Sequence, residues 1–317
     1  MGSTPQRIAS LLPAATEIVA ALGARDRLVL RSHECDVPEG VQALPHATEP
    51  RWGPDGTSYG IDEQVKAVVQ EALSVYRVDS EVLAEADPDL VITQEQCRVC
   101  AVSTDELAAA VAGILDPAPR ILSLSPGDLD AVFADMARVA EALGDPEAGR
   151  VLVAGLRGRL DDLREAVEGR ARPRLLAIEW LDPLMVSGNW IPELVHAAGG
   201  ENLLAEPGAH SPFVEWPDLR ATDPDVIVVM PCGFTVERTL EERHLLEDLP
   251  GWNEMRAVKA GRVAVADGHH FFNRPGPRVV ESAEILAEVL HPGVVDRGHR
   301  ERRAWVPLGA ATKRRAG

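Results

Sequence analysis

Four cysteines are the residues of this 317-residue chain whose type and spacing most clearly suggest chemistry. They are Cys35, Cys97, Cys100 and Cys232, and the middle two form a Cys-x-x-Cys pair. Four thiolates can ligate a zinc ion or an iron–sulfur cluster, so one prediction is a metal centre on these four residues. Three other interpretations stay open: buried small side chains, a disulfide between Cys97 and Cys100, or a redox-active pair.

Each cysteine lies in a loop that follows an apolar, branched run typical of a buried parallel strand. In parallel α/β sheets, ligands bind outside the carboxyl ends of the strands. The binding site should therefore be formed by the loops that follow predicted strands. These loops are 13–17, 33–36, 94–103, 179–190, 231–234 and 268–278.

The same loops hold carboxylates, imidazoles, aromatic rings and polar anchors of the kind that line ligand pockets. The candidate ligand-binding residues are Pro13, Ala14, Thr16, His33, Glu34, Glu95, Glu179, Trp180, Asn189, Trp190, Phe234, His270 and Arg274, with His269 and Arg278 beside them. We expect one of the two tryptophans to cover the neighbouring core instead. We find no nucleophile elbow, His-Glu-x-x-His, P-loop or Rossmann glycine pattern, so we predict a binding protein and no catalytic residues.

An internal repeat indicates how these loops are positioned. Residues 85–92 (EADPDLVI) are echoed by residues 221–228 (ATDPDVIV), and in each copy a proline ends a helix before a β-rich run. A strand and a glycine-stopped helix precede each copy, over 7–22 and over 174–198. The sequence therefore predicts a duplicated α/β lobe.

Between the two copies, residues 126–169 show apolar residues at helical spacing and no flexible linker. The expected fold is α/β, with two Rossmann-like lobes that have parallel sheets and are joined by a long rigid helix. The expected boundaries are an N-terminal lobe at 1–125, connecting helices at 126–172, a C-terminal lobe at 173–293 and a basic, flexible tail at 294–317.

The formal net charge of −18 argues against a nucleic-acid groove, which requires clustered cations. The chain beyond residue 293 is the exception, with seven Lys/Arg and two acidic residues. No apolar stretch reaches transmembrane length and no signal peptide is visible. We therefore expect a cytoplasmic location as written, or a periplasmic or extracellular one if a leader was removed.

Three motifs carry a family resemblance: residues 8–17 (IASLLPAATE), 188–190 (GNW) and 272–278 (FNRPGPR). With their order along the chain, they resemble the cobalamin and iron-chelate group of ABC-transporter substrate-binding proteins, which have the class III periplasmic-binding-protein fold. The resemblance implies a metal-containing ligand, a corrinoid or an iron chelate, held in a cleft between the lobes. It also implies an ABC permease as partner if the chain is exported, and structural roles for both Asp-Pro-Asp segments.

The four cysteines set this chain apart from typical corrinoid binders and suggest a changed ligand. The first alternative is a redox or cluster-dependent cytosolic enzyme that uses a centre on those cysteines. The second alternative is an interaction module that has lost its ligand.

Overall fold

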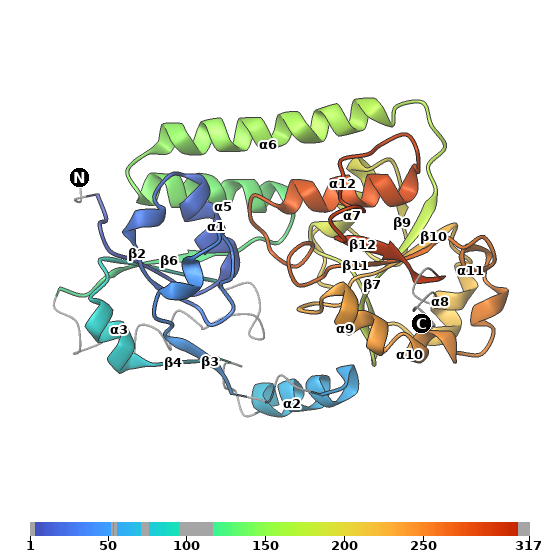
Figure 1. Cartoon of the computed structure of the whole chain (residues 1–317), viewed down its shortest axis with the longest axis horizontal. Helices are drawn as coiled ribbons and strands as arrows, with labels where there is room; N and C mark the ends of the chain where they lie inside the picture. Colours follow the sequence, from blue (N-terminus) through green and yellow to red (C-terminus); the bar gives the residue numbers. More distant parts are fainter. Residues whose placement is uncertain (1–3, 52, 54–55, 71–75, 95–116, 310–317) are drawn as a thin grey trace, which may run out of the picture. The chain divides into compact units, whose positions relative to one another are not determined.

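The computed structural model describes residues 4–51, 53, 56–70, 76–94 and 117–309, and the chain divides into two compact units (Figure 1). Unit 1 comprises Met1–Gly56, Gly60–Pro126 and Asp130–Gly155. Unit 2 comprises Thr57–Tyr59, Gly127–Leu129 and Leu156–Gly317. Each unit is built on a largely parallel sheet with helices, which confirms the predicted α/β fold class.

Unit 1 contains a four-stranded parallel sheet in the order β2-β1-β5-β6. Its strands are short, and β1 and β5 are fully buried, as apolar strands covered on both faces should be. The strands are β1 (Ile8–Ser10), β2 (Leu28–Arg31), β5 (Leu90–Gln94) and β6 (Arg120–Leu124), with an antiparallel pair β3 (Thr48–Pro50) and β4 (Tyr76–Val78). The helices in this part of the chain are α1 (Pro13–Ala21), α2 (Ser58–Gln70), α3 (Ser80–Ala86) and α5 (Leu129–Ala142), with single 3-10 turns η1 (Arg25–Arg27) and η2 (Val41–Ala43).

Unit 2 contains a mixed sheet in the order β12-β11-β10-β7-β8, with β9 also paired to β7. The central strands β11, β10 and β7 are parallel, whereas β12 and β8 are antiparallel edges. The strands are β7 (Arg174–Leu181), β8 (Leu184–Val186), β9 (Glu201–Asn202), β10 (Val226–Val229), β11 (Val263–Ala266) and β12 (Trp305–Pro307). The helices are α7 (Ile191–Ala197), α8 (Trp216–Ala221), α9 (Val236–Glu241), α10 (His244–Glu247), α11 (Arg256–Lys259) and α12 (Val279–Leu290), with one 3-10 turn, η3 (Trp252–Glu254).

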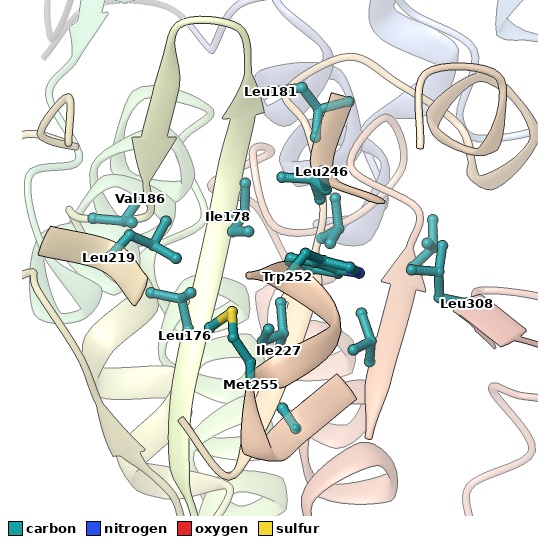
Figure 2. Close-up of a cluster of buried hydrophobic side chains, with 14 of the residues drawn as sticks. Leu176, Ile178, Leu181, Val186, Leu219, Ile227, Leu246, Trp252, Met255 and Leu308 are labelled. Atoms are coloured by element: carbon teal, nitrogen blue, oxygen red, sulfur yellow. The ribbon is translucent and has the colours of Figure 1, made fainter. Parts of the chain in front are cut away.

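One face of this sheet packs against α8 to α11 and η3 around the fully buried Trp252 (Figure 2). Leu176 and Ile178 of β7 and Ile227 of β10 point into this cluster, at the alternate positions that a strand presents to one face. The intervening residues of the same strands are buried too, on the side of α7 and α12 (Figure 1). A sheet covered on both faces explains why these strands read as continuous apolar runs.

The two Asp-Pro-Asp segments play the same structural role, as expected. Asp89 accepts hydrogen bonds from the amides of Gln6 and Arg7 at 2.8 and 3.1 Å, at the start of β1. In unit 2, Asp225 accepts from the amide of Arg174 at 2.9 Å, at the start of β7. The residue two positions earlier takes a left-handed conformation in both copies, with φ of 40° at Asp87 and 38° at Asp223.

The predicted connecting helices are present as α5 and α6 (Pro146–Ala166), separated by Gly144 at a φ of 81°. Helix α6 begins in unit 1 and ends in unit 2, since the division between the units falls after Gly155. Within the described part of the chain, no helix combines the length and apolar character needed to cross a bilayer.

The expectation of a flexible tail is wrong for residues 294–309. Glu288 of α12 is 4% exposed and accepts hydrogen bonds from the amides of Arg297, His299 and Arg300 and from the indole of Trp305. Strand β12 then pairs with β11. A buried carboxylate with four donors organises this segment, which charge counting alone could not reveal.

His299 extends this network into the unit. It is 1% exposed, and its Nδ1 accepts a hydrogen bond from Arg302, because a guanidinium can only donate. Its Nε2 therefore donates to Glu284, at 3.0 Å. Arg159 of α6 donates to both oxygens of Glu284 at 3.0 and 2.9 Å, so the tail, α12 and α6 meet at one carboxylate.

We predict that Asp225→Ala lowers the free energy of unfolding by about 1–3 kcal/mol, because it removes an acceptor for the Arg174 amide and for Arg256. Urea denaturation followed by circular dichroism measures the change. Asp162→Ala on the exposed side of α6 is the control and should shift stability by less than about 0.5 kcal/mol. Equal effects of the two substitutions would contradict the anchoring role.

A second prediction concerns acid stability. Burial alone would raise the pKa of Glu284, but hydrogen bonds from His299 and Arg159 lower that pKa below its ordinary value. Ionised Glu284 therefore stabilises the fold above the ordinary glutamate pKa of about 4.3, and this stabilisation is lost as the pH falls through the lowered value.

Glu284→Gln should therefore lower the free energy of unfolding by about 1–3 kcal/mol at pH 7, with the deficit shrinking below about pH 4. Urea titrations between pH 7 and pH 3.5 test this, with the exposed Glu165→Gln as control. A deficit that stays constant over this range would refute the ionised-state argument.

Candidate functional site

In unit 2 the strand order reverses between β7 and β10, so the loops that leave these strands diverge at their carboxyl ends. Such a switch point is where open α/β sheets bind ligands. The loop after β10 holds Cys232 and Phe234, and β7 itself ends with Glu179, Trp180 and Leu181. These segments contact one another, since the Cys232 amide donates to the Glu179 carbonyl at 3.1 Å.

Glu179 is a nearly buried carboxylate, 9% exposed, at this edge. Its Oε2 accepts a hydrogen bond from the hydroxyl of Ser211 at 3.0 Å, and the Ser211 oxygen accepts from the amide of Gly188 at 2.9 Å. The carboxylate therefore has a fixed orientation set by the 209–211 segment. Sequence reasoning selected Glu179 but missed Ser211, because the two lie 32 positions apart and no local pattern links them.

Trp180 and Phe234 form an aromatic pair, with ring centroids 5.2 Å apart and planes tilted by 55°. The guanidinium of Arg238 lies over the Phe234 ring, 4.4 Å from its centroid. Arg238 also donates to Glu242 at 2.6 Å, which fixes it in place. The two aromatic residues selected from the sequence thus lie beside a cation that the sequence did not indicate, Arg238 of α9.

The loop after β11 carries the imidazoles. Asp267 accepts hydrogen bonds from the amides of His269 and His270, both at 2.9 Å, and its other oxygen lies 2.7 Å from Nδ1 of His270. Burial alone would raise the pKa of Asp267, but these hydrogen bonds lower that pKa below its ordinary value. Asp267, absent from our candidate residues, is therefore the ionised group that orients this loop.

Arg274 is 7% exposed, and its Nη2 lies 3.1 Å from Nε2 of His269. Because arginine only donates, His269 accepts through Nε2. The two adjacent imidazoles stand edge to face, with centroids 4.6 Å apart. Arg274 thus makes His269 a hydrogen-bond acceptor, whereas the ionised Asp267 makes His270 a hydrogen-bond donor.

Gly268 allows the β11 loop to lie directly on the β10 loop. A Cβ at this position would overlap the carbonyl oxygens of Pro231 and Met230. The next amide, of His269, donates to the Phe234 carbonyl at 3.0 Å. The imidazole loop and the aromatic pair are therefore joined by backbone contact within one unit.

Asn189 and Trp190, two expected ligand-binding residues that follow β8, differ in burial. Trp190 is 6% exposed and its indole donates to the Phe272 carbonyl at 2.8 Å, so it is the tryptophan that covers core. Asn189 is half-buried in a left-handed conformation, with a φ of 52°. Its amide donates to the Ala209 carbonyl at 2.6 Å.

In unit 1 the end of β1, the first turn of α1 and the loop after β2 form a buried polar cluster. Thr16 Oγ1 donates to Ser10 Oγ at 2.8 Å and lies 3.0 Å from Sγ of Cys35, and all three side chains are at most 1% exposed. Ala14 is buried beside them, and Pro13 begins α1. Thr16 thus holds the Cys35 thiol in the interior, a contact that no sequence spacing suggested.

His33 and Glu34 lie half-buried in the loop after β2. His33 contacts Thr48 through Nδ1 at 2.7 Å, and burial lowers the pKa of this imidazole. Glu34 accepts a hydrogen bond from the hydroxyl of Tyr76 at 2.9 Å. Tyr76, whose ring lies 5.1 Å from that of His33, joins the two and was not among our candidates.

Two of the four cysteines predicted to form a metal centre lie among the described residues. Cys35 is buried and Cys232 is exposed. Cys97 and Cys100, with Glu95, lie outside the described residues. The four-cysteine centre stays a prediction.

The sequence model of the family described as "Periplasmic binding protein" matches residues 8–269. This chain belongs to that family. The match includes β1 and the loops after β7, β10 and β11 up to His269, and the remaining site residues follow directly.

Two curated relatives cover most of the chain. An uncharacterised ABC transporter substrate-binding lipoprotein of Bacillus subtilis, YvrC, is 25% identical over 295 residues, 91% of this chain and 81% of the relative. A vitamin B12-binding protein of Yersinia pestis is 24% identical over 289 residues, 90% of this chain and 86% of the relative.

Solved structures in the family share the fold. The periplasmic haem-binding protein RhuT from Roseiflexus is 24% identical, with a TM-score of 0.68 over 92% of this chain and 98% of that one. An ABC-type Fe3+-hydroxamate transport system protein from Saccharomonospora viridis is 21% identical, with a TM-score of 0.64 over 92% and 95%. These likenesses confirm the class III fold that the resemblance implied.

The close approach of Gly268 to the β10 loop can be tested by substitution. We expect Gly268→Ala to lower the free energy of unfolding by about 1–3 kcal/mol and to displace the imidazole loop, because the added methyl meets backbone oxygens that cannot rotate away. Thermal melts and amide chemical shifts of His269 and His270 provide the measurement.

The control is Gly158→Ala in α6, where a Cβ has no heavy atom within 4 Å. In a helix interior this change should be neutral or stabilising by up to about 1 kcal/mol. A Gly268→Ala protein as stable as Gly158→Ala would show that the two loops are not in close contact.

Proposed function

We propose that this protein binds a metal-containing chelate, a corrinoid, a haem or an iron chelate, at the carboxyl edge of its sheets, and presents it to an ABC permease. The observation that carries the proposal is the edge of the unit 2 sheet where Glu179, Trp180 and Phe234 lie at the switch point. The adjoining β11 loop, which carries His270, is joined to Phe234 through the His269 amide. Together they combine two aromatic rings with oriented carboxylate and imidazole side chains, which suits a large ligand that is partly apolar.

The family supports this ligand class. Proteins with this fold and similar sequence carry names that specify vitamin B12, haem and Fe3+-hydroxamate. Each of these ligands is a metal held by an organic chelator. A permease partner is proposed on the same grounds, because relatives are named as ABC transport components. An export location would follow from that role.

Binding is tested with purified protein and four probes: cyanocobalamin, aquocobalamin, hemin and ferric ferrichrome. We expect at least one probe to quench the fluorescence of Trp180 and to raise the melting temperature, because a ligand that binds only the folded state stabilises it. Trp180→Ala should weaken that binding by about 10-fold or more, since stacked aromatic contact contributes about 1.5 kcal/mol or more.

Val151→Ala, an exposed apolar position on α6, is the matched control and should leave affinity unchanged. If no probe binds with an affinity better than millimolar, the ligand assignment is wrong.

A resident centre on Cys35, Cys97, Cys100 and Cys232 stays a second candidate, and it rests on the sequence alone. The cluster-dependent enzyme depends on the same centre. Elemental analysis of anaerobically purified protein, with acid-labile sulfide, tests it: iron with matching sulfide, or zinc, should be retained. Each of the four Cys→Ser variants should lose it, and unchanged metal content in all four would eliminate this candidate.

A further inference from the structure

The first turn of helix α2 is attached to unit 2 by a buried glutamate. Thr57–Tyr59 belongs to unit 2, whereas Gly56 before it and Gly60 after it belong to unit 1. The amide of Ser58, a residue that is 0% exposed, donates to both oxygens of Glu242 at 3.1 Å. The chain thus enters unit 2 for three residues and is held there through its backbone.

The attachment uses an amide that the helix itself cannot satisfy. Ser58 is the first residue of α2, and the first amides of a helix have no acceptor within it. Glu242, which directly follows α9, is 4% exposed. Burial alone would raise the pKa of Glu242, but hydrogen bonds from Arg238 and Ser58 lower that pKa below its ordinary value. The acceptor is therefore an ionised carboxylate, which binds an amide more strongly than a neutral oxygen does.

The same carboxylate also contacts the candidate binding edge. Glu242 accepts a hydrogen bond from Arg238 at 2.6 Å, and the Arg238 guanidinium lies 4.4 Å from the centroid of the Phe234 ring. Phe234 in turn pairs with Trp180. One buried group therefore holds both the start of α2 and the cation on the aromatic pair.

We propose that Thr57–Tyr59 is a strap, fastened by Glu242, that opens when a ligand enters or leaves the edge of unit 2 at Trp180 and Phe234. The proposal rests on the proposed function. Tyr59, directly after the fastened residue, is 55% exposed, so the strap carries a large exposed side chain next to its fastening point.

The strap can open without leaving a buried charge unpaired. When the Ser58 amide leaves Glu242, the carboxylate keeps its ion pair with Arg238 at 2.6 Å. The freed amide then donates to water. Thr57–Tyr59 is not part of any described strand of unit 2, so its release does not disturb the sheet that carries the aromatic pair.

Hydrogen exchange tests the fastening without a ligand. Glu242→Ala removes the acceptor and should speed exchange of the Ser58 amide by about 10-fold or more, because the amide becomes accessible to water more often. Glu241→Gln is the matched control: Glu241 is 70% exposed and lies 3.5 Å from the same Arg238, and its loss of charge should leave the exchange rate within about 2-fold of wild type.

Stopped-flow quenching of tryptophan fluorescence by hemin, and separately by cyanocobalamin, tests the opening step. Ser58→Pro removes the donor amide and leaves Glu242 in place, and proline suits the first position of a helix. Association and dissociation should both become at least about 3-fold faster, with a dissociation constant within about 2-fold of wild type, because a released strap speeds passage in both directions.

Ser80→Pro is the matched control for this substitution. Ser80 is the first residue of α3 in unit 1, and among the described residues its amide donates no hydrogen bond. Both rates should equal those of wild type. Circular dichroism verifies that each variant is folded before the rates are compared.

The outcomes distinguish the two proposals. Equal exchange of the Ser58 amide in wild-type and Glu242→Ala protein overturns the fastening. Unchanged rates in Ser58→Pro overturn the strap while ligand binding stands, and so does faster dissociation alone, which would make the segment a ligand contact and not a gate. If wild-type protein binds none of the four chelate probes, the proposed function fails and the strap fails with it.

Discussion

In each unit, one aspartate fixes the register between the two strands on either side of the switch point. Asp89 does so for β1 and β5, and Asp225 for β7 and β10. Each accepts the amide at the start of the first strand, and each donates its own amide to a carbonyl there. Strands buried on both faces cannot leave these backbone groups unpaired, so the register of the pair is set at this point. The positions of the carboxyl ends of these strands follow from that register.

At that edge in unit 2, most polar groups already have partners within the protein. Ser211 orients Glu179, Asp267 orients His270, Arg274 contacts His269, and Glu242 holds Arg238 over the aromatic pair. A ligand bound at this edge, as we propose, would meet side chains whose rotamers are already restricted, so less conformational entropy would be lost on binding.

The two units share a plan but differ at the ends of their strands. In unit 1 the polar side chains at the end of β1 and in the first turn of α1 point inward, and Thr16 joins Ser10 to Cys35. In unit 2 the end of β7 leaves part of Trp180 exposed beside Phe234 of the β10 loop, and the β11 loop carries two imidazoles. Among the described residues, those of unit 2 therefore support the proposed binding of a metal chelate better than those of unit 1.

The sequence by itself determined the α/β class, the repeated Asp-Pro-Asp anchors, the connecting helices and the loops at the carboxyl ends of the strands. These features depend on local signals: proline stops, glycine caps, apolar runs and helical periodicity. It also selected Glu179, Trp180, Phe234, His270 and Arg274. It could not supply Ser211, because its partner Glu179 lies 32 positions away. Arg238 lies four positions after Phe234, but only the folded chain shows that its guanidinium lies over that ring. Asp267 lies close to His270 in the chain, but only the folded loop shows that its carboxylate accepts from that ring.

Only the tertiary structure decided that Trp190 covers core, that Cys35 is buried against Thr16, and that residues 294–309 are held by Glu288. The basic composition of that last segment suggested a flexible tail, because composition reports charge and not the position of a buried acceptor. Burial and hydrogen-bond partnership are properties of the packed chain. Residue type limits what a side chain can do, and packing determines which of those possibilities is used.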